Sequence, residues 1–159
     1  DLKGRSLTLL VNIENTAKSA AANEIARQLQ EAGLRVTVER LPWEEYTAAL
    51  AARDFDLYLG EVYLTPDFDL SALIAPGGAL NYGGWEDSVI SGLLSAFRTA
   101  EGELRQSAAA SLYRYLCQQA PIAPICFKNG SVLTQYGRLD QLNPTQYNVF
   151  YDLSHWTVP

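Results

Sequence analysis

The chain contains no methionine, only two cysteines and a single histidine. Two cysteines are too few for a disulfide framework, and their apolar neighbours favour two buried free thiols at Cys117 and Cys126, with a bridge between them as the alternative. His155 alone cannot supply the three protein ligands of a catalytic zinc site. Translation starts at Met and this sequence starts at Asp1, so we expect that an N-terminal part has been removed, either a signal peptide or the preceding part of a longer protein.

Long apolar runs and a surplus of basic residues are also lacking. No apolar run approaches the roughly 20 residues that span a bilayer, and no basic segment followed by an apolar one opens the chain. Lys and Arg total 12 against 18 Asp and Glu, giving a net charge of −6. This balance argues against nucleic acid and anionic membrane as partners. With 159 residues, of which 48% are hydrophobic and 19% charged, the chain is expected to form one domain, alone or with a short extension.

The first 62 residues alternate between strand and helix patterns. Apolar, β-branched runs predict strands over residues 6–13, 34–41 and 55–62, the third of them central. Apolar residues at helical spacing lie between these strands; Asn15 is a candidate cap, Gly33 ends the first helix and Pro42 opens the second. Strands joined by short helical crossovers predict an α/β domain with a mainly parallel sheet.

Beyond the third strand the pattern changes. A turn-rich segment over residues 65–85 holds one short helical turn near residues 71–74, and loops of this length are often functional. Two helices follow, with Val89 and Leu104 among the residues assigned to their apolar faces. Pro121 stops the second helix. Residues 122–127 and 131–136 then predict two further strands joined by a turn at Asn129 and Gly130, and residues 137–159 form an aperiodic tail.

Motifs of common enzyme classes are missing from the sequence. There is no GxSxG, no P-loop and no GxGxxG, which predicts a protein that is not an enzyme and has no cofactor. A phosphoacceptor receiver domain would need Glu14, Asp67 and Lys128 in its acidic and basic roles, but the third strand ends without an Asp. Asp67 and Asp69 are candidates for acid–base chemistry, with capping of the local backbone as the alternative.

Ligands of open α/β sheets gather beyond the carboxyl ends of the strands. Polar and aromatic residues in that region, together with the 65–85 loop, form a surface that suits binding better than bond-making. Packing in the core or at a helix start is the alternative for the aromatic members. The candidate ligand-binding residues are Asn12, Glu14, Glu61, Tyr63, Asp67, Asn81, Tyr82 and Trp85.

The order of motifs resembles the later lobe of family 5 extracellular solute-binding proteins, which serve ABC importers of peptides, nickel and related solutes. The segments that carry the resemblance run from Leu29 to Gly33, from Trp43 to Tyr46, from Phe55 to Gly60 and from Pro66 to Leu70. Later stretches, NYGGWEDSVISGLL, YRYLCQQAPIAPICF and NPTQYNVFYDLSHW, are also similar to the family, so the resemblance covers nearly the whole chain.

The resemblance implies a periplasmic-binding-protein-like lobe over residues 1–136 and a tail, residues 137–159, that crosses back to a first lobe absent from this sequence. It implies an extracytoplasmic protein, a cell-surface lipoprotein or a periplasmic one, that delivers its solute to ABC permease subunits. Peptide-binding members carry Trp and Asp where this chain has Glu61 and Leu64, so the usual clamp for the peptide amino group is absent here. The family's nickel-type members can use a His near the C-terminus; His155 lies in a DLSHW turn, and we expect no metal site in this chain.

The function expected from these observations is capture of a peptide or similar small solute for import. The alternative is a stand-alone α/β enzyme or signalling domain that uses the loop over residues 61–85. Sequence upstream of this chain distinguishes the two.

Overall fold

The computed structural model describes residues 4–128 and 131–158, and it divides into two compact units, residues 1–121 and 122–159. Each unit is described by itself below. The expected boundary between lobe and tail at residue 136 stays a prediction.

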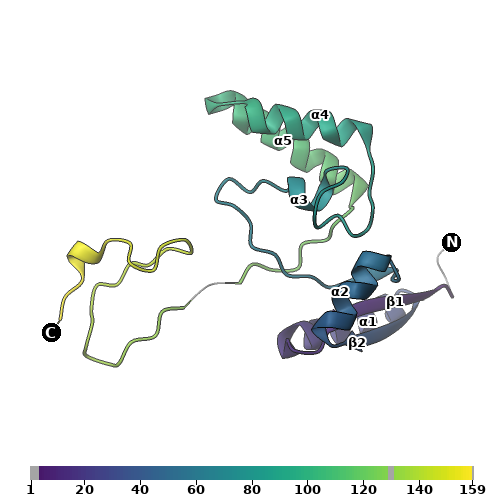
Figure 1. Ribbon diagram of the computed structural model, residues 1–159, viewed down its shortest axis with the longest axis horizontal. Coiled ribbons are helices and arrows are strands. Elements are labelled where there is room, and N and C mark those ends of the chain that lie inside the picture. Colours follow the sequence, from purple (N-terminus) through teal and green to yellow (C-terminus); the bar gives the residue numbers. More distant parts are fainter. Residues whose placement is uncertain (1–3, 129–130, 159) are drawn as a thin grey trace. The chain divides into compact units, whose positions relative to one another are not determined.

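The first unit alternates strands and helices before it turns wholly helical (Figure 1). Its elements in chain order are β1 (Ser6–Asn12), α1 (Thr16–Glu31), β2 (Arg35–Leu41), α2 (Trp43–Ala52), β3 (Leu57–Tyr58), α3 (Ser71–Ile74), α4 (Ser88–Thr99) and α5 (Gly102–Gln119). In the described part of the chain, no helix is long and apolar enough to cross a membrane.

The three strands share one parallel sheet in the order β2-β1-β3, which confirms the predicted α/β class. β1 pairs with β2 along its whole length, from Ser6 opposite Arg35 to Asn12 opposite Leu41. β3 pairs with β1 only at Leu57 and Tyr58, so the prediction of a long, central third strand is wrong. β1 is central because it pairs with a strand on each side, and its consecutive residues are buried on both faces, as expected of an inner parallel strand.

Alternate residues of β1 point to two different helices. Leu9 and Val11 pack with Ala22 and Ala26 of α1 and with Val36 of β2. Since successive side chains of a strand point to opposite faces, α1 and α2 cover opposite sides of the sheet. The small side chains at positions 22 and 26 allow α1 to lie close to the sheet.

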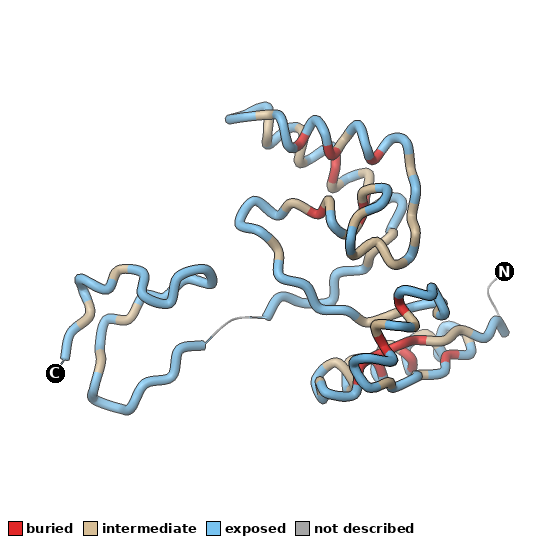
Figure 2. The backbone as a smooth tube through the Cα atoms, viewed as in Figure 1, coloured by how far each residue is buried: buried red, intermediate tan, exposed pale blue. Residues whose placement is uncertain are grey.

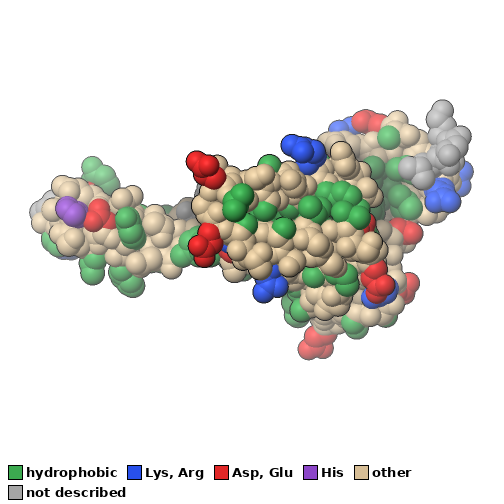
Figure 3. Space-filling view, turned by 90° about the horizontal axis from the view of Figure 1, so that it is seen from above, with side chains coloured by type: hydrophobic (Ala, Val, Ile, Leu, Met, Phe, Trp, Pro, Cys, Tyr) green, Lys and Arg blue, Asp and Glu red, His purple; other side chains and the backbone are tan. Residues whose placement is uncertain are grey.

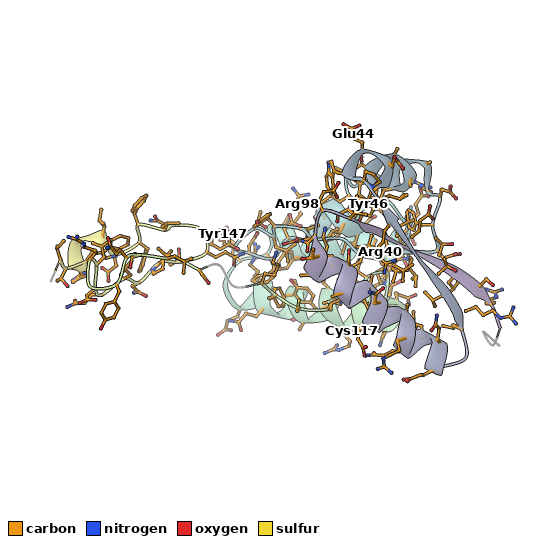
Figure 4. All side chains as sticks on the ribbon, turned by 90° about the horizontal axis from the view of Figure 1, so that it is seen from below. Arg40, Glu44, Tyr46, Arg98, Cys117 and Tyr147 are labelled. Atoms are coloured by element: carbon orange, nitrogen blue, oxygen red, sulfur yellow. The ribbon has the colours of Figure 1, made fainter. Side chains whose placement is uncertain are left out.

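The α2 side of the sheet is built on Leu10, Tyr46 and Leu50, each at most 3% exposed. The hydroxyl of Tyr46 donates to the Leu59 carbonyl oxygen over 3.1 Å, so the buried phenol is satisfied. Burial raises the pKa of this phenol above its ordinary value of 10.0. Figure 4 shows Glu44 of the same helix directed away from the unit, as expected for the polar face of an amphipathic helix.

Local signals set the helix ends largely as predicted. The Asn15 side chain caps α1 by accepting a hydrogen bond from the Lys18 N–H over 3.0 Å. Gly33, with φ of 95°, takes the left-handed conformation just after α1, where a side chain is disfavoured. Pro42 immediately precedes α2. Trp43, the first residue of α2, is 55% exposed.

Helices α4 and α5 pack against each other, and α3 has the predicted position. The expectation fails for Val89 and Leu104, which are 51% and 74% exposed. Each lies near the start of its helix. The residues of this helical part that are buried are Leu70, Ile74, Ile90, Leu94, Phe97, Leu112 and Leu116.

The second unit has almost no regular structure. Residues 122–127 and 131–136 form no strand, which makes both strand predictions wrong, and the turn expected at Asn129 and Gly130 lies outside the described residues. Pro121 and Pro124 have no backbone N–H to donate to a neighbouring strand. No strand of the described chain pairs with either segment. The regular structure described in this unit is an antiparallel bridge between Asp140 and Thr157 and a 3₁₀ turn, η1 (Leu153–His155).

Figure 2 shows that burial is confined to the first unit: none of the described residues after 121 is buried. Cys126 in this segment and Cys117 on α5 are both free and exposed, so the prediction of two buried thiols is wrong. The reason for Cys117 is its position on α5, one residue beyond the buried Leu116 and therefore turned away from that side of the helix.

Candidate ligand-binding site

The carboxyl edge of the sheet gathers three of the predicted site residues. β1 and β3 are parallel neighbours, so the residues that follow them emerge at the same edge. Asn15, which caps α1, also donates from Nδ2 to Glu61 Oε2 over 3.3 Å. This contact joins the loop after β1 to the segment after β3. Asn12, Glu14 and Glu61, with Asn15 between them, are called the carboxyl-edge cluster below.

Within this cluster, Asn12 and Glu14 form a fixed pair. The Asn12 amide donates from Nδ2 to Glu14 Oε2 over 3.0 Å, and the Trp43 backbone N–H donates to Glu14 Oε1 over 2.7 Å. These two hydrogen bonds, the Asn12 bond first, lower the pKa of Glu14 below its ordinary value of 4.5. The carboxylate is therefore charged at neutral pH, and it connects the end of β1 to the start of α2.

Asn12 is the polar residue among the buried residues of the described chain, at 5% exposed. Its amide nitrogen is satisfied by Glu14, but its Oδ1 is buried and accepts no hydrogen bond. A buried acceptor without a donor lowers stability by about 1–3 kcal/mol. Asn12 Oδ1 is such an unsatisfied acceptor at the edge of the sheet.

Tyr63 extends the same edge, two residues beyond Glu61, and is 92% exposed. Such a ring contributes nothing to the core and is free to contact another molecule. Its role in ligand binding stays a prediction.

Asp67 contacts the helical part of the unit and not the carboxyl-edge cluster. Its Oδ2 accepts from Arg105 Nη2 of α5 over 2.8 Å, and the Arg105 guanidinium lies 4.5 Å from the ring centre of Phe97. A hydrogen bond from Thr65 and, to a smaller extent, the Arg105 charge lower the pKa of Asp67. Asp69 Oδ1 accepts a hydrogen bond from the Ser71 N–H over 2.9 Å. This contact corresponds to capping of the local backbone, the alternative to acid–base chemistry. Both carboxylates thus hold the loop onto helices.

Asn81, Tyr82 and Trp85 have structural contacts inside the loop. Asn81 Nδ2 donates to the Ala75 and Trp85 carbonyl oxygens over 3.0 and 2.8 Å, and its Oδ1 accepts from the Trp85 N–H over 3.0 Å. The Tyr82 ring meets Tyr58 edge to face, with ring centres 6.0 Å apart. Asn81 and Trp85 close the loop, and Tyr82 packs against the core on the α2 side.

Sequence reasoning missed two partners in this region. Asn15 was recognised only as a cap, because its contact with Glu61 spans 46 residues of sequence. Arg105 lies 38 residues from Asp67 and carries no local signal of that pairing. A charged residue on an otherwise apolar helix side is the kind of signal that could have drawn attention to it.

A shallow groove of about 580 Å³ lies between α3 and α4, apart from the predicted site residues. Hydroxyls and one cation, Arg98, line much of it, and Arg98 Nε lies 3.8 Å from Asp69 Oδ2. Figure 4 labels Arg98 on this part of the unit. The residues lining the groove are Ser71, Ala75, Pro76, Ser91, Leu94, Ser95, Arg98 and Thr99.

Metal-binding chemistry is poorly represented. No group of three or more His, Cys, Asp or Glu residues is placed to hold a metal ion within residues 4–128 and 131–158. His155 Nδ1 lies 2.5 Å from Oδ1 of Asp152, the residue just before the 3₁₀ turn, and the two form an exposed local pair.

Comparison with known proteins gives matches in structure. No protein-family model matches the chain, and no curated protein matches its sequence. AppA from Clostridium difficile, described as a peptide binding protein, superposes over 99% of this chain and 34% of its own, with a TM-score of 0.81 at 16% identity. MppA, a periplasmic murein tripeptide binding protein of Escherichia coli, matches 76% of this chain and 24% of its own, with a TM-score of 0.66 at 23% identity.

A nickel ABC transporter protein from Bacillus halodurans matches 73% of this chain and 25% of its own, with a TM-score of 0.62 at 24% identity. The chain spans between 24% and 34% of the length of these three structures. AppA and MppA are described as binding proteins, and the Bacillus halodurans protein is described as a nickel ABC transporter. The chain therefore has the mixed α/β, periplasmic-binding-protein-like fold that part of these solute-binding proteins shares.

Proposed function

We propose that this chain is one lobe of the substrate-binding protein of an ABC importer, which captures a peptide or similar small solute between two lobes. The observation that carries the proposal is the likeness to AppA, which extends over 99% of this chain and only 34% of AppA. A chain that is one lobe of a receptor is expected to match a longer binding protein over the whole of its own length and over only part of that protein. Closure of two lobes around a ligand is the corresponding hinge mechanism.

The second unit supports the presence of a further lobe. Its described residues include a high share of exposed, large apolar side chains, and Figure 3 shows hydrophobic side chains standing out from this segment. Exposed apolar groups of this kind mark contact surfaces. In the proposed receptor, residues 137–159 cross back onto the first lobe, which covers Tyr147, Phe150, Tyr151 and Trp156.

The carboxyl-edge cluster and Tyr63 form the proposed ligand-facing surface. Asn12, Glu14 and Glu61 offer hydrogen-bond acceptors at the edge where α/β domains bind ligands, and Tyr63 adds an exposed ring. Asp67, Asn81, Tyr82 and Trp85 support this surface through the loop contacts described above.

The proposed protein acts outside the cytoplasm, as a periplasmic protein or a surface lipoprotein, and passes its solute to ABC permease subunits. It carries out no reaction of its own. Neither nickel nor a nickel complex is favoured over a peptide by the residues of the described chain.

The test is to purify the full-length protein from its native cells under mild conditions and identify bound solutes by mass spectrometry. We expect a peptide or related small solute in stoichiometric amount, together with upstream coding sequence for a larger first lobe. Upstream sequence that begins with a start codon directly before Asp1 and a preparation free of solute would contradict the proposal.

A further inference from the structure

The groove between α3 and α4 is separate from the candidate ligand-binding residues, since none of them lines it. Its volume of about 580 Å³ falls within the range of about 300–1,000 Å³ that is usual for small-molecule sites. One wall consists of Ser71, in α3, and of Ala75 and Pro76, which follow that helix (Figure 1). The other wall is α4. The space between the two walls is therefore large enough for a small molecule.

The α4 wall presents two hydroxyls and a cation on one helix face. Ser91 and Ser95 are four residues apart and Arg98 follows three residues later, so the three side chains are neighbours along the same side of the helix. All three are exposed. A serine hydroxyl both donates and accepts hydrogen bonds, whereas a guanidinium only donates. This face of α4 is rich in hydrogen-bond donors and suits a ligand that accepts.

Asp69 lies beside Arg98 and orients it. Asp69 Oδ2 is 3.8 Å from Arg98 Nε, and Asp69 Oδ1 accepts from the N–H and the hydroxyl of Ser71 over 2.9 and 2.5 Å. A guanidinium can meet a carboxylate through its Nε edge or through the edge formed by its two terminal nitrogens. Because Asp69 faces the Nε edge, the terminal edge is the one that a ligand meets. The Arg98 side chain is 64% exposed and that of Asp69 is 26% exposed, so a ligand from solvent reaches the cation more readily than the acid.

The charges around the groove favour a ligand with a single negative charge. Among the described residues that line it, Arg98 is the charged one, and Asp69 offsets part of that charge. The nearby Arg105 is paired with Asp67 over 2.8 Å. A phosphate group carries a charge of about −1.5 to −2 at neutral pH and would meet one arginine beside an acid. A carboxylate carries one charge, and its planar shape matches the edge of a guanidinium.

We propose that this groove binds a small carboxylic acid with a short aliphatic body. The carboxylate lies against the terminal nitrogens of Arg98 and accepts from the hydroxyl of Ser95. The aliphatic body packs against Leu94, Ala75 and Pro76, the apolar residues of the lining. This site goes beyond the proposed import function and does not depend on it, because all of its residues belong to the first unit.

The direct test uses a matched pair of probes, N-acetylleucine and N-acetylleucinamide, which differ in a carboxylate against an uncharged carboxamide. Each is titrated into the ¹⁵N-labelled 159-residue chain while the backbone N–H of Ser95 and the Nε–H of Arg98 are followed by NMR. We expect saturable shifts with the acid. Binding of the amide should be weaker by about tenfold or more, because hydrogen bonds from arginine to a charged acceptor are stronger than those to a neutral one.

Arg98→Gln should weaken binding of the acid by about tenfold or more and remove the preference for acid over amide. Arg98→Lys keeps the charge but lacks the paired terminal nitrogens, so it should restore only part of the binding. Arg114→Gln is the control, because it removes an exposed arginine of α5 outside the groove and changes the net charge equally. Binding by this variant should equal that of the wild type.

Thermal unfolding checks that the variants retain the fold, and we expect equal midpoints for Arg98→Gln and Arg114→Gln because both side chains are exposed. Equal binding of the two probes, an equal effect of the two glutamine variants on binding, or no saturable shift at millimolar probe would overturn the carboxylate site. Any of these results leaves the proposed import function standing.

Discussion

Tyr115 of α5 donates its hydroxyl hydrogen to Asp87 Oδ2 over 2.5 Å, while Asp87 Oδ1 accepts from the Val89 and Ile90 N–H groups. One carboxylate thus caps α4 and joins it to α5. Tyr115→Phe and Asp87→Asn should each lower the unfolding midpoint, and the double variant should lose less than the two single losses combined, because both disrupt the same contact. Urea unfolding of the four proteins measures this. Fully additive losses would show that the two residues act independently.

The same contact predicts how stability depends on pH. The Tyr115 hydrogen bond lowers the pKa of Asp87 below its ordinary value of 3.8, and hydrogen bonds from Arg27 and Gln28 lower the pKa of Glu24 to about 2. A carboxyl with a depressed pKa in the folded state binds protons more readily when unfolded. Its contribution is therefore complete above the unfolded-state pKa and is lost as the pH falls through the folded-state pKa.

We expect the free energy of unfolding to fall as the pH drops below about 4.5, and Asp87→Asn to flatten that fall. Urea unfolding at a series of pH values from about 7 to 3 checks both expectations. A stability that rises in this range would contradict the direction of the shifts.

Gly78 lies too close to backbone carbonyl oxygens for any side chain to fit. A Cβ at this position would lie 2.6 Å from the Ala72 carbonyl oxygen and 2.8 Å from that of Ser71. Gly78→Ala should destabilise the protein by about 1–3 kcal/mol, through overpacking against backbone. Gly92→Ala is the matched control, since nothing lies within 4 Å of its added Cβ and it stands inside α4. That change should stabilise by about 0.5–1 kcal/mol. Similar effects of the two changes would contradict the close contact at Gly78.

Leu112 and Leu104 test the packing of α5. Leu112 is 0% exposed and Leu104 is 74% exposed on the same helix. Leu112→Ala should cost about 2–5 kcal/mol by leaving a cavity, whereas Leu104→Ala should change stability by no more than about 0.5 kcal/mol. Thermal unfolding compares the two variants. A large loss at Leu104 in this chain alone would place that side chain in a packed interior.

Ending the chain after Pro121 tests the division into two units. Every residue described as buried lies at or before position 116, so the shortened chain retains the whole core. We expect it to unfold cooperatively, with a circular dichroism spectrum that keeps the helical signal. A shortened chain without a cooperative transition would show that residues 122–159 are needed for the first unit to fold.

The parts of this fold that follow from sequence are those set by near neighbours. The apolar run of β1, the Asn15 cap and Gly33 place the first strand and helix within a residue or two. Residues 122–127 carry the same kind of strand pattern and form no strand, because a strand requires a hydrogen-bonding partner and none of the described residues pairs with this segment.

The candidate site was predictable to a similar degree. The carboxyl ends of parallel strands indicated Asn12, Glu14 and Glu61, and the contact through Asn15 brings the segments that carry them together. Asp67 was assigned to the same surface because it follows the same strand. Its pairing with Arg105 depends on how the loop meets α5, which spacing in sequence does not encode.

The most direct measurement of the two-lobe function is calorimetric titration of a panel of peptides and nickel complexes against this 159-residue chain and against the full-length protein. A ligand enclosed between two lobes buries most of its surface only when both are present, and each tenfold step in affinity corresponds to about 1.4 kcal/mol. We expect the full-length protein to bind at least one member of the panel, and this chain alone to bind it more than tenfold more weakly. Binding by the isolated chain within about tenfold of the full-length affinity would contradict the two-lobe mechanism.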